Sequence, residues 1–161
     1  MHDATLIAGW VRDCGLAGLF LWSLLAATLL PLSSEAVLAA ARGAGLASVP
    51  VLFLVATAGN VGGALINWAL GAYCLRFKHR RWFPFSDVQM QKAGARFSRW
   101  GVAALLFSWI PVVGDPLTFA AGALRYPLAR FLIAVTIGKA ARYAFVLWIT
   151  GAALPVFAAS W

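Results

Sequence analysis

Acidic residues, cysteines and histidines are scarce in this sequence. Of its 161 residues only 5 are Asp or Glu, 2 are Cys and 2 are His. Cys14 and Cys74 form no C-x-x-C pair and have no histidine cluster nearby, so we expect neither a disulfide framework nor a metal site. His2 and His79 fit no Ser-His-Asp or metal-ligand spacing. We therefore expect no enzyme and no cofactor.

The start of the chain lacks the marks of a removable signal peptide. The segment MHDATLIAGWVRDCG has no basic n-region and no small-residue cleavage site. Hydrophobic residues make up 63% of the chain and charged residues 11%, and the mean hydropathy is +0.85. This composition is far from that of a soluble domain. We expect a membrane protein whose apolar segments belong to the fold.

Positive charge is concentrated between two apolar halves. The net charge is +8, and residues 76–99 hold seven of the 13 basic residues, opposed there only by Asp87. The positive-inside rule places loop 76–99 in the cytoplasm and both termini in the periplasm. A polybasic segment beside membrane spans more often meets anionic lipid headgroups than nucleic acid. We expect membrane lipids as partners and no nucleic acid.

Two apolar runs are long enough to cross a bilayer, and a third is not. Residues 51–74 and 128–151 can span as helices, whereas residues 16–30 would measure about 22 Å, short of the roughly 30 Å hydrocarbon core. Pro31 and the polar residues up to Glu35 interrupt the short run, and a small-residue stretch follows. This pattern predicts a helical hairpin that enters the membrane and returns.

The second half of the chain repeats the landmarks of the first. An offset of 80 residues aligns Pro31 with Pro111 and Glu35 with Asp115, and about ten of some fifty positions are identical. Pro111, Gly114 and Pro116 would break the second hairpin. One crossing per repeat requires the repeats to be inverted, a plan found in secondary transporters.

The expected fold is thus an all-α integral membrane protein. A single domain, 1–161, would contain two inverted repeats, about 16–75 and 100–153, each with a re-entrant hairpin and a transmembrane helix. The linker 76–99 would join them through a helix lying on the membrane surface. Its apolar stripe holds Met90, Ala93, Phe97 and Trp100, and the neighbouring basic face holds Lys92, Arg96 and Arg99.

Two cations fall near the centre of the last crossing. Lys139 lies about 18 Å along the helix that follows Pro127, and Arg142 is one turn further on the same face. Each charge at that depth costs about 2.5–3.5 kcal/mol. Glu35 and Asp115 are the only acids at comparable depth. We expect these four side chains to face one another, with hydrogen-bond donors added by Asn60.

Such a cluster suits an anionic substrate. A phosphate group can displace a carboxylate from Lys139 or Arg142, and protonation of that carboxylate would release the cation, coupling passage to protons. A set of buried ion pairs that only holds the bundle together is the alternative.

Several motifs resemble the DedA family of bacterial inner-membrane proteins, which carry the VTT or SNARE-associated domain, and within it the short YqaA-like branch. The resemblance covers nearly the whole chain. The second-hairpin motif is the most specific, because Ala-Gly follows its proline at a fixed distance. The motifs are P31-L-S-S-E35, G59-N-x-x-G63, W109-I-P-V-V-G-D-P-L-T-F-A-A-G122, R125-Y-P-x-x-R-F131 and G138-K-A-A-R-Y143.

The resemblance implies two re-entrant hairpins that face each other. It also implies membership of a family that is linked to flipping or scrambling phospholipids and the undecaprenyl phosphate carrier. Several members of that family depend on the proton-motive force. We therefore expect a transporter of a lipid phosphate or phospholipid headgroup. A structural or assembly factor of the membrane and a small-ion transporter remain alternatives. Two crossings give a monomer little mass with which to enclose a pathway, so a homodimer is left open.

Overall fold

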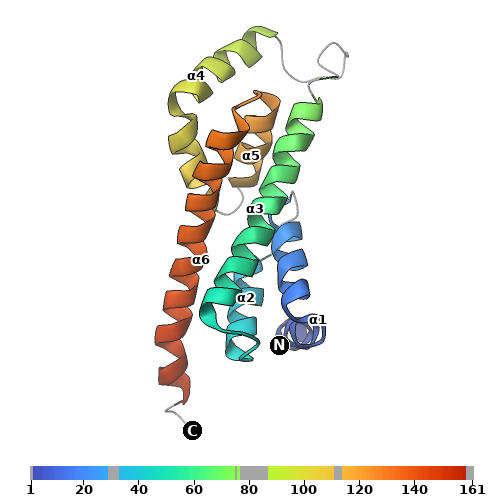
Figure 1. Cartoon of the computed structure of the whole chain (residues 1–161), viewed down its shortest axis with the longest axis vertical. Coiled ribbons are helices and arrows are strands. Elements are labelled where there is room, and N and C mark those ends of the chain that lie inside the picture. Colours follow the sequence, from blue (N-terminus) through green and yellow to red (C-terminus); the bar gives the residue numbers. More distant parts are fainter. Residues whose placement is uncertain (1, 29–32, 75, 77–86, 111–113, 159–161) are drawn as a thin grey trace. The chain divides into compact units, whose positions relative to one another are not determined.

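The computed structural model describes residues 2–28, 33–74, 76, 87–110 and 114–158, and within these ranges every regular element is a helix (Figure 1). The all-α expectation is confirmed for this part of the chain. Pro31 and Pro111, the predicted hairpin tips, lie outside the described residues. The elements in chain order are α1 (His2–Ala26), α2 (Ser34–Gly43), α3 (Val49–Cys74), α4 (Asp87–Leu106), the 3-10 helix η2 (Phe107–Trp109), α5 (Gly114–Ala123) and α6 (Leu128–Ala158).

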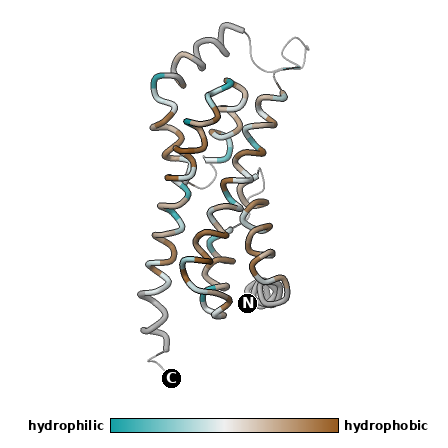
Figure 2. The backbone as a smooth tube through the Cα atoms, in the orientation of Figure 1, coloured by the Kyte–Doolittle hydropathy of each residue, from teal (hydrophilic) through white to brown (hydrophobic). Residues whose placement is uncertain are grey.

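Among the described residues, two helices are long and apolar enough to cross a membrane. They are α3 and the part of α6 from Leu128 to Gly151, which match the two expected crossings. Figure 2 shows α3 mostly brown or pale, with teal at isolated positions. Pro50 falls in the first turn of α3, where its missing N–H would have no intrahelical partner.

The chain divides into two compact units, each built from part of both long helices. The first unit comprises Met1–Gly63 and Lys139–Trp161, and the second comprises Ala64–Gly138. The predicted repeats, 16–75 and 100–153, follow the chain instead, so these units do not coincide with them. The repeat boundaries stay a prediction.

A tightly packed core holds the first unit together. Its fully or almost fully buried members are contributed by α1, α2, α3 and α6: Leu19, Val37, Leu38, Ala41, Leu52, Ala56, Tyr143 and Leu147. Gly59 and Gly63 let α3 approach α1 closely, because a Cβ at either position would collide with the backbone carbonyl of Phe20 or Leu24.

Helix α1 has a kink that separates two segments. Gly15 adopts φ 56° and ψ −143°, which is not helical and which glycine reaches without a Cβ penalty. Among the described side chains of α1, the apolar stretch runs from Cys14 to Ala26 and includes the kink. It packs against α2, as expected for the two arms of a hairpin. The depth of this pair in a membrane stays a prediction.

The second unit has its own core, formed by α3, α4, α5 and α6. Its buried members include Leu105, Ala121, Tyr126, Phe131 and Val135. Close glycine contacts pack α5 on α3, since a Cβ at Gly71 would meet the Phe119 carbonyl and one at Gly122 would meet the Trp68 carbonyl. At the same contact between α3 and α5, Asn67 donates a 3.2 Å hydrogen bond to the Thr118 hydroxyl.

The bounds of the helices follow the same 80-residue offset as the sequence landmarks. Helix α2 covers residues 34–43 and α5 covers 114–123, while α1 ends at Ala26 and α4 at Leu106. The turns that follow α2 and α5 also correspond. Leu46 donates its N–H to the Ala41 carbonyl at 3.0 Å, and Tyr126 donates its N–H to the Ala121 carbonyl at 2.9 Å. Both are the backbone hydrogen bonds of a Schellman motif at the end of a helix.

The basic linker contains a helix, but this helix does not end with the linker. Helix α4 continues past residue 99 to Leu106 and so joins the linker to the second predicted repeat. Phe97 packs edge-on against Tyr126 with ring centroids 5.1 Å apart, whereas Trp100 from the same predicted stripe is 64% exposed. Arg99 is exposed beside Trp100. The side chains of Lys92 and Arg96 lie outside the described residues.

Candidate functional site

The site begins at the first turn of α2, where a serine caps the helix. Ser33 has an extended backbone, and its hydroxyl oxygen accepts the Ala36 N–H at 3.3 Å. The same hydroxyl donates to Oε2 of Glu35 at 3.1 Å. Glu35 therefore stands in the first turn, where the positive end of the helix dipole favours a carboxylate. The Ser33 cap thus holds the Glu35 carboxylate at the start of α2.

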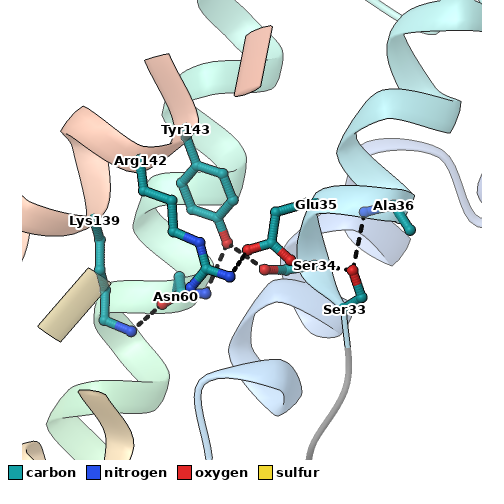
Figure 3. A network of polar contacts seen from close by, with 8 residues as sticks. All are labelled: Ser33, Ser34, Glu35, Ala36, Asn60, Lys139, Arg142 and Tyr143. Atoms are coloured by element: carbon teal, nitrogen blue, oxygen red, sulfur yellow. Dashed lines mark hydrogen bonds and ion pairs between the residues drawn. The ribbon is translucent and has the colours of Figure 1, made fainter. Parts of the chain in front are cut away.

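Glu35 forms an ion pair with a cation of α6. Its Oε1 contacts Nη2 of Arg142, and the Arg142 and Glu35 side chains are 19% and 24% exposed (Figure 3). Both side chains are therefore partly accessible, although the Oε1 atom that makes the contact is itself buried. The pairing of Arg142 with Glu35 is one that the sequence led us to expect.

A relay of hydrogen bonds runs beside this ion pair (Figure 3). Lys139 Nζ donates to Oδ1 of Asn60, Asn60 Nδ2 donates to the Tyr143 hydroxyl at 2.7 Å, and Tyr143 donates to Ser34 Oγ at 2.9 Å. All the bonds point away from the ammonium group, an alignment in which each bond polarises the next. Lys139 is only 3% exposed and Tyr143 only 1%. The relay therefore connects the buried Lys139 ammonium group to Ser34 in the first turn of α2.

Two consecutive residues of α2 thus meet two consecutive residues of α6. Ser34 contacts Tyr143 through a neutral hydrogen bond, and Glu35 contacts Arg142 through charge. The neutral contact is buried, whereas the charged contact is partly open. The two contacts differ in what can disturb them, because only the charged one responds to anions or to protonation.

The residues proposed from the sequence separate into two groups. Glu35, Asn60, Lys139 and Arg142 all belong to the first unit and gather around the start of α2. Asp115 belongs to the second unit, where it stands in the first turn of α5, as Glu35 does in α2. The expected meeting of Asp115 with Lys139 and Arg142 stays a prediction.

Two of the proposed hairpin breaks can be placed within the second unit. Gly114 begins α5 and is buried so close to the Ser108 backbone that a Cβ would collide with it. Pro116 is exposed in the first turn of α5, a position that tolerates proline. Gly114 thus has a packing role that the sequence landmark alone does not reveal.

Sequence reasoning missed Ser34 and Tyr143. A tyrosine in an apolar helix resembles ordinary packing, and a serine before an acid resembles a cap, so neither residue type signals a partner. Tyr143 does follow Arg142 directly, and Ser34 directly precedes Glu35. That adjacency to the charged pair was the available signal.

Sequence reasoning also assigned no role to Arg42 in the last turn of α2. Its Nη1 donates to the Leu147 carbonyl of α6 and contacts the Thr150 hydroxyl at 3.4 Å. Thr150 also bonds to the Val146 carbonyl at 2.9 Å. A Cβ at Gly151 would collide with the Arg42 guanidinium, so glycine at this position makes room for it.

Within the described part of the chain, no group of three His, Cys, Asp or Glu side chains could hold a metal ion. What the described site offers instead is a guanidinium, a carboxylate, a buried ammonium and neutral hydrogen-bonding groups. These are suited to binding an anion and to exchanging a proton at a carboxylate.

Comparison with known proteins identifies relatives along most of the chain. Residues 30–152 match the model of the VTT domain. The inner membrane protein YqaA of Escherichia coli (strain K12) is 41% identical over 131 residues, covering 81% of this chain and 87% of that protein, and YqaA of Shigella flexneri gives the same values. An uncharacterized protein of Haemophilus influenzae is 32% identical over 142 residues, covering 82% and 85%. No solved structure matches.

Proposed function

The chain belongs to the VTT-domain (DedA) family of membrane proteins, and on this premise we propose that it transports a lipid phosphate or a phospholipid headgroup across the bacterial inner membrane. The observation that carries the proposal is the contact between Glu35 and Arg142, a partly exposed ion pair beside a buried lysine on an otherwise apolar helix. Charges at membrane depth are costly and commonly mark a substrate or proton pathway.

The binding step would be an exchange of anions at Arg142. The planar guanidinium presents paired N–H donors that fit a phosphate as well as a carboxylate. An incoming phosphate would approach along the accessible parts of the two side chains and replace the buried Oε1 atom of Glu35 on Nη2. The phosphate would thus enter with its charge compensated throughout, which avoids leaving a bare cation in the apolar interior.

Lys139 would hold the site positive. Lys139 and Arg142 are three residues apart and therefore share one face of α6. Asn60 accepts from the Lys139 ammonium, and the relay through Tyr143 fixes the position of Asn60 relative to α2. Replacing Lys139 would remove one charge and the fixed end of the relay, so we expect both substrate binding and transport to be lost.

Proton coupling would use the two hairpin carboxylates. Displaced Glu35 can take up a proton, after which Arg142 stays available to the phosphate. Asp115 stands in the corresponding first turn of α5 and would carry the same step in the second repeat. We propose that the repeats are inverted and their hairpins re-entrant, so that the two carboxylates serve opposite faces of the membrane.

The proposed orientation places loop 76–99 in the cytoplasm and both termini in the periplasm, because cytoplasmic loops carry the excess of Lys and Arg. Cysteines introduced near Arg80 and near Met1, in a chain freed of Cys14 and Cys74, would be treated with an impermeant thiol reagent from outside the cell. We expect labelling near Met1 and protection near Arg80. The reverse pattern would overturn the orientation.

The proposed transport can be tested with purified protein in liposomes. A fluorescent phospholipid in the inner leaflet would be followed by quenching from outside, with and without an inward-acidic pH gradient, beside a diacylglycerol analogue that lacks the phosphate. We expect the protein to accelerate passage of the phospholipid and the gradient to accelerate it further. Arg142→Ala and Lys139→Ala should abolish this, while the exposed Arg130→Ala should not.

Three results would point elsewhere. Equal rates in empty and protein-containing liposomes would favour a structural or assembly factor, in which the ion pair only joins α2 to α6. Passage of small ions without lipid movement would favour an ion transporter. Release of inorganic phosphate from a lipid phosphate would indicate an enzyme.

A further inference from the structure

The Arg42 guanidinium lies between two helices, and the corresponding helices of the second unit pack together without a charged side chain. In the first unit, the last turn of α2 meets α6 through Arg42, which lies over Gly151 and donates to the Leu147 carbonyl. At the offset of 80 residues, Arg42 corresponds to Gly122 and Gly151 to Gly71. In the second unit, Gly122 and Gly71 let α5 and α3 pack backbone against backbone.

The comparison within one chain shows that this crossing does not require an arginine. A glycine pair closes it in the second unit, and small residues are the usual solution where membrane helices approach closely. The first unit instead places a guanidinium at this contact, where the second unit has no charged group. A ligand that interacts with the charge would explain why the first unit carries it.

The position of Arg42 along the helices corresponds to the edge of a bilayer. Arg42 lies in the last turn of α2, followed by an exposed turn and then by Val49, where the first candidate span begins. Its contacts on α6 lie between Leu147 and Gly151, and the helix continues beyond them to Ala158. Trp148, one turn before, is 70% exposed, as expected for an aromatic anchor at the interface.

The guanidinium retains donors for a ligand. Both of its bonds leave from Nη1, and within the described part of the chain neither Nη2 nor Nε bonds to an acceptor and no carboxylate pairs with Arg42. The side chain is only partly buried. The abundant anion at a bilayer edge is the phosphate of a phospholipid, whose oxygens match the guanidinium fork.

We propose that Arg42, held over Gly151 by the Leu147 carbonyl and the Thr150 hydroxyl, is a docking site for the phosphate of one membrane phospholipid. The site is distinct from the Glu35–Arg142 contact, since Arg42 lies seven residues further along α2, about 10 Å as a helix. It does not depend on the proposed transport. Its lipid would remain bound at the edge of the protein.

The test is native mass spectrometry of the full-length protein released from detergent with defined lipids. The probes are phosphatidylglycerol, diacylglycerol with the same acyl chains, and inorganic phosphate. We expect a one-to-one adduct with phosphatidylglycerol only, reduced roughly tenfold in Arg42→Ala. Gly151→Ala should reduce it as well, because the new methyl group displaces the flexible guanidinium while the charge remains. Arg130→Ala controls for the loss of an exposed positive charge.

The outcomes are decisive in both directions. An undiminished adduct in Arg42→Ala and Gly151→Ala would overturn the proposal and leave Arg42 as a pin between α2 and α6. An equal adduct with diacylglycerol would show that the phosphate is not recognised, and displacement by inorganic phosphate would identify a free anion as the ligand. Should Arg42→Ala fail to fold, Gly151→Ala alone decides. Arg142→Ala should retain the adduct, which separates this site from the transport site.

Discussion

Tyr143 donates a 2.9 Å hydrogen bond to Ser34, and the next residue on α2 and the preceding residue on α6 form the ion pair. The start of α2 therefore contacts α6 in two ways. The neutral hydrogen bond of Tyr143 is insensitive to ions, whereas the ion pair is sensitive to them. If the charged contact opens during function, the buried neutral contact can keep the two helices in register.

Tyr143→Phe should destabilise the protein. The substitution removes the acceptor of the Asn60 amide and the donor to Ser34, leaving buried polar groups without partners, each at a cost of about 1–3 kcal/mol. We expect a lower thermal midpoint in detergent, and a smaller fall for Ser34→Ala. In the double variant the two losses should be less than additive, because both remove the same bond. Strict additivity would show that the bond contributes nothing.

Exchanging the charges of the pair should separate stability from activity. Glu35→Arg combined with Arg142→Glu restores the attraction between the two side chains. An arginine in the first turn of α2 is unfavourable with the helix dipole, which lowers the free energy of unfolding by about 0.3–1 kcal/mol. We expect the double variant to have a higher thermal midpoint than either single variant but no lipid movement in liposomes, since the substrate needs its cation on α6. Recovered transport would mean that only the pairing matters.

Asp115→Asn should insert and fold but lose activity. Asn resembles the protonated acid in shape and can still accept a hydrogen bond, so yield and thermal midpoint should stay near those of the unsubstituted protein. Glu35→Gln should behave alike, because Arg142 is partly exposed and is not left fully buried without a charge. Extracted yield and thermal midpoint would be measured beside the lipid assay. Normal lipid movement in Asp115→Asn would exclude its carboxylate from the mechanism.

The two corresponding turns give a further prediction. Gly45 and Arg125 occupy the same place after α2 and α5, with φ of 63° and 51°, but a left-handed backbone costs a side chain about 1 kcal/mol or more. Gly45→Arg should therefore lower the thermal midpoint. Arg125→Gly should leave it equal or raise it slightly, because relieved strain is offset by the greater unfolded-state freedom of glycine. A clear fall for Arg125→Gly would reveal a contact that the backbone argument omits.

The two long apolar helices and the place of the first acid at each hairpin could be predicted from the amino-acid sequence. Run length identified α3 and the apolar part of α6 as candidate spans, because a helix must be long enough to cross a bilayer and apolar residues must fill it. The offset of 80 residues aligned Asp115 with Glu35, and each of the two lies in the first turn of its helix. These features depend on neighbours along the chain, so local patterns reveal them.

Which polar groups contact one another depends on how the helices pack. The scarcity of acids made Glu35 a partner for a deep cation, but the choice of Arg142, the relay through Tyr143 to Ser34 and the seating of Arg42 over Gly151 depend on packing. Each residue along a helix turns the side chain by about 100°, and a neighbouring helix fixes that rotation through its close contacts. Partners separated by some hundred residues are therefore set by the fit of whole helices, which no local pattern encodes.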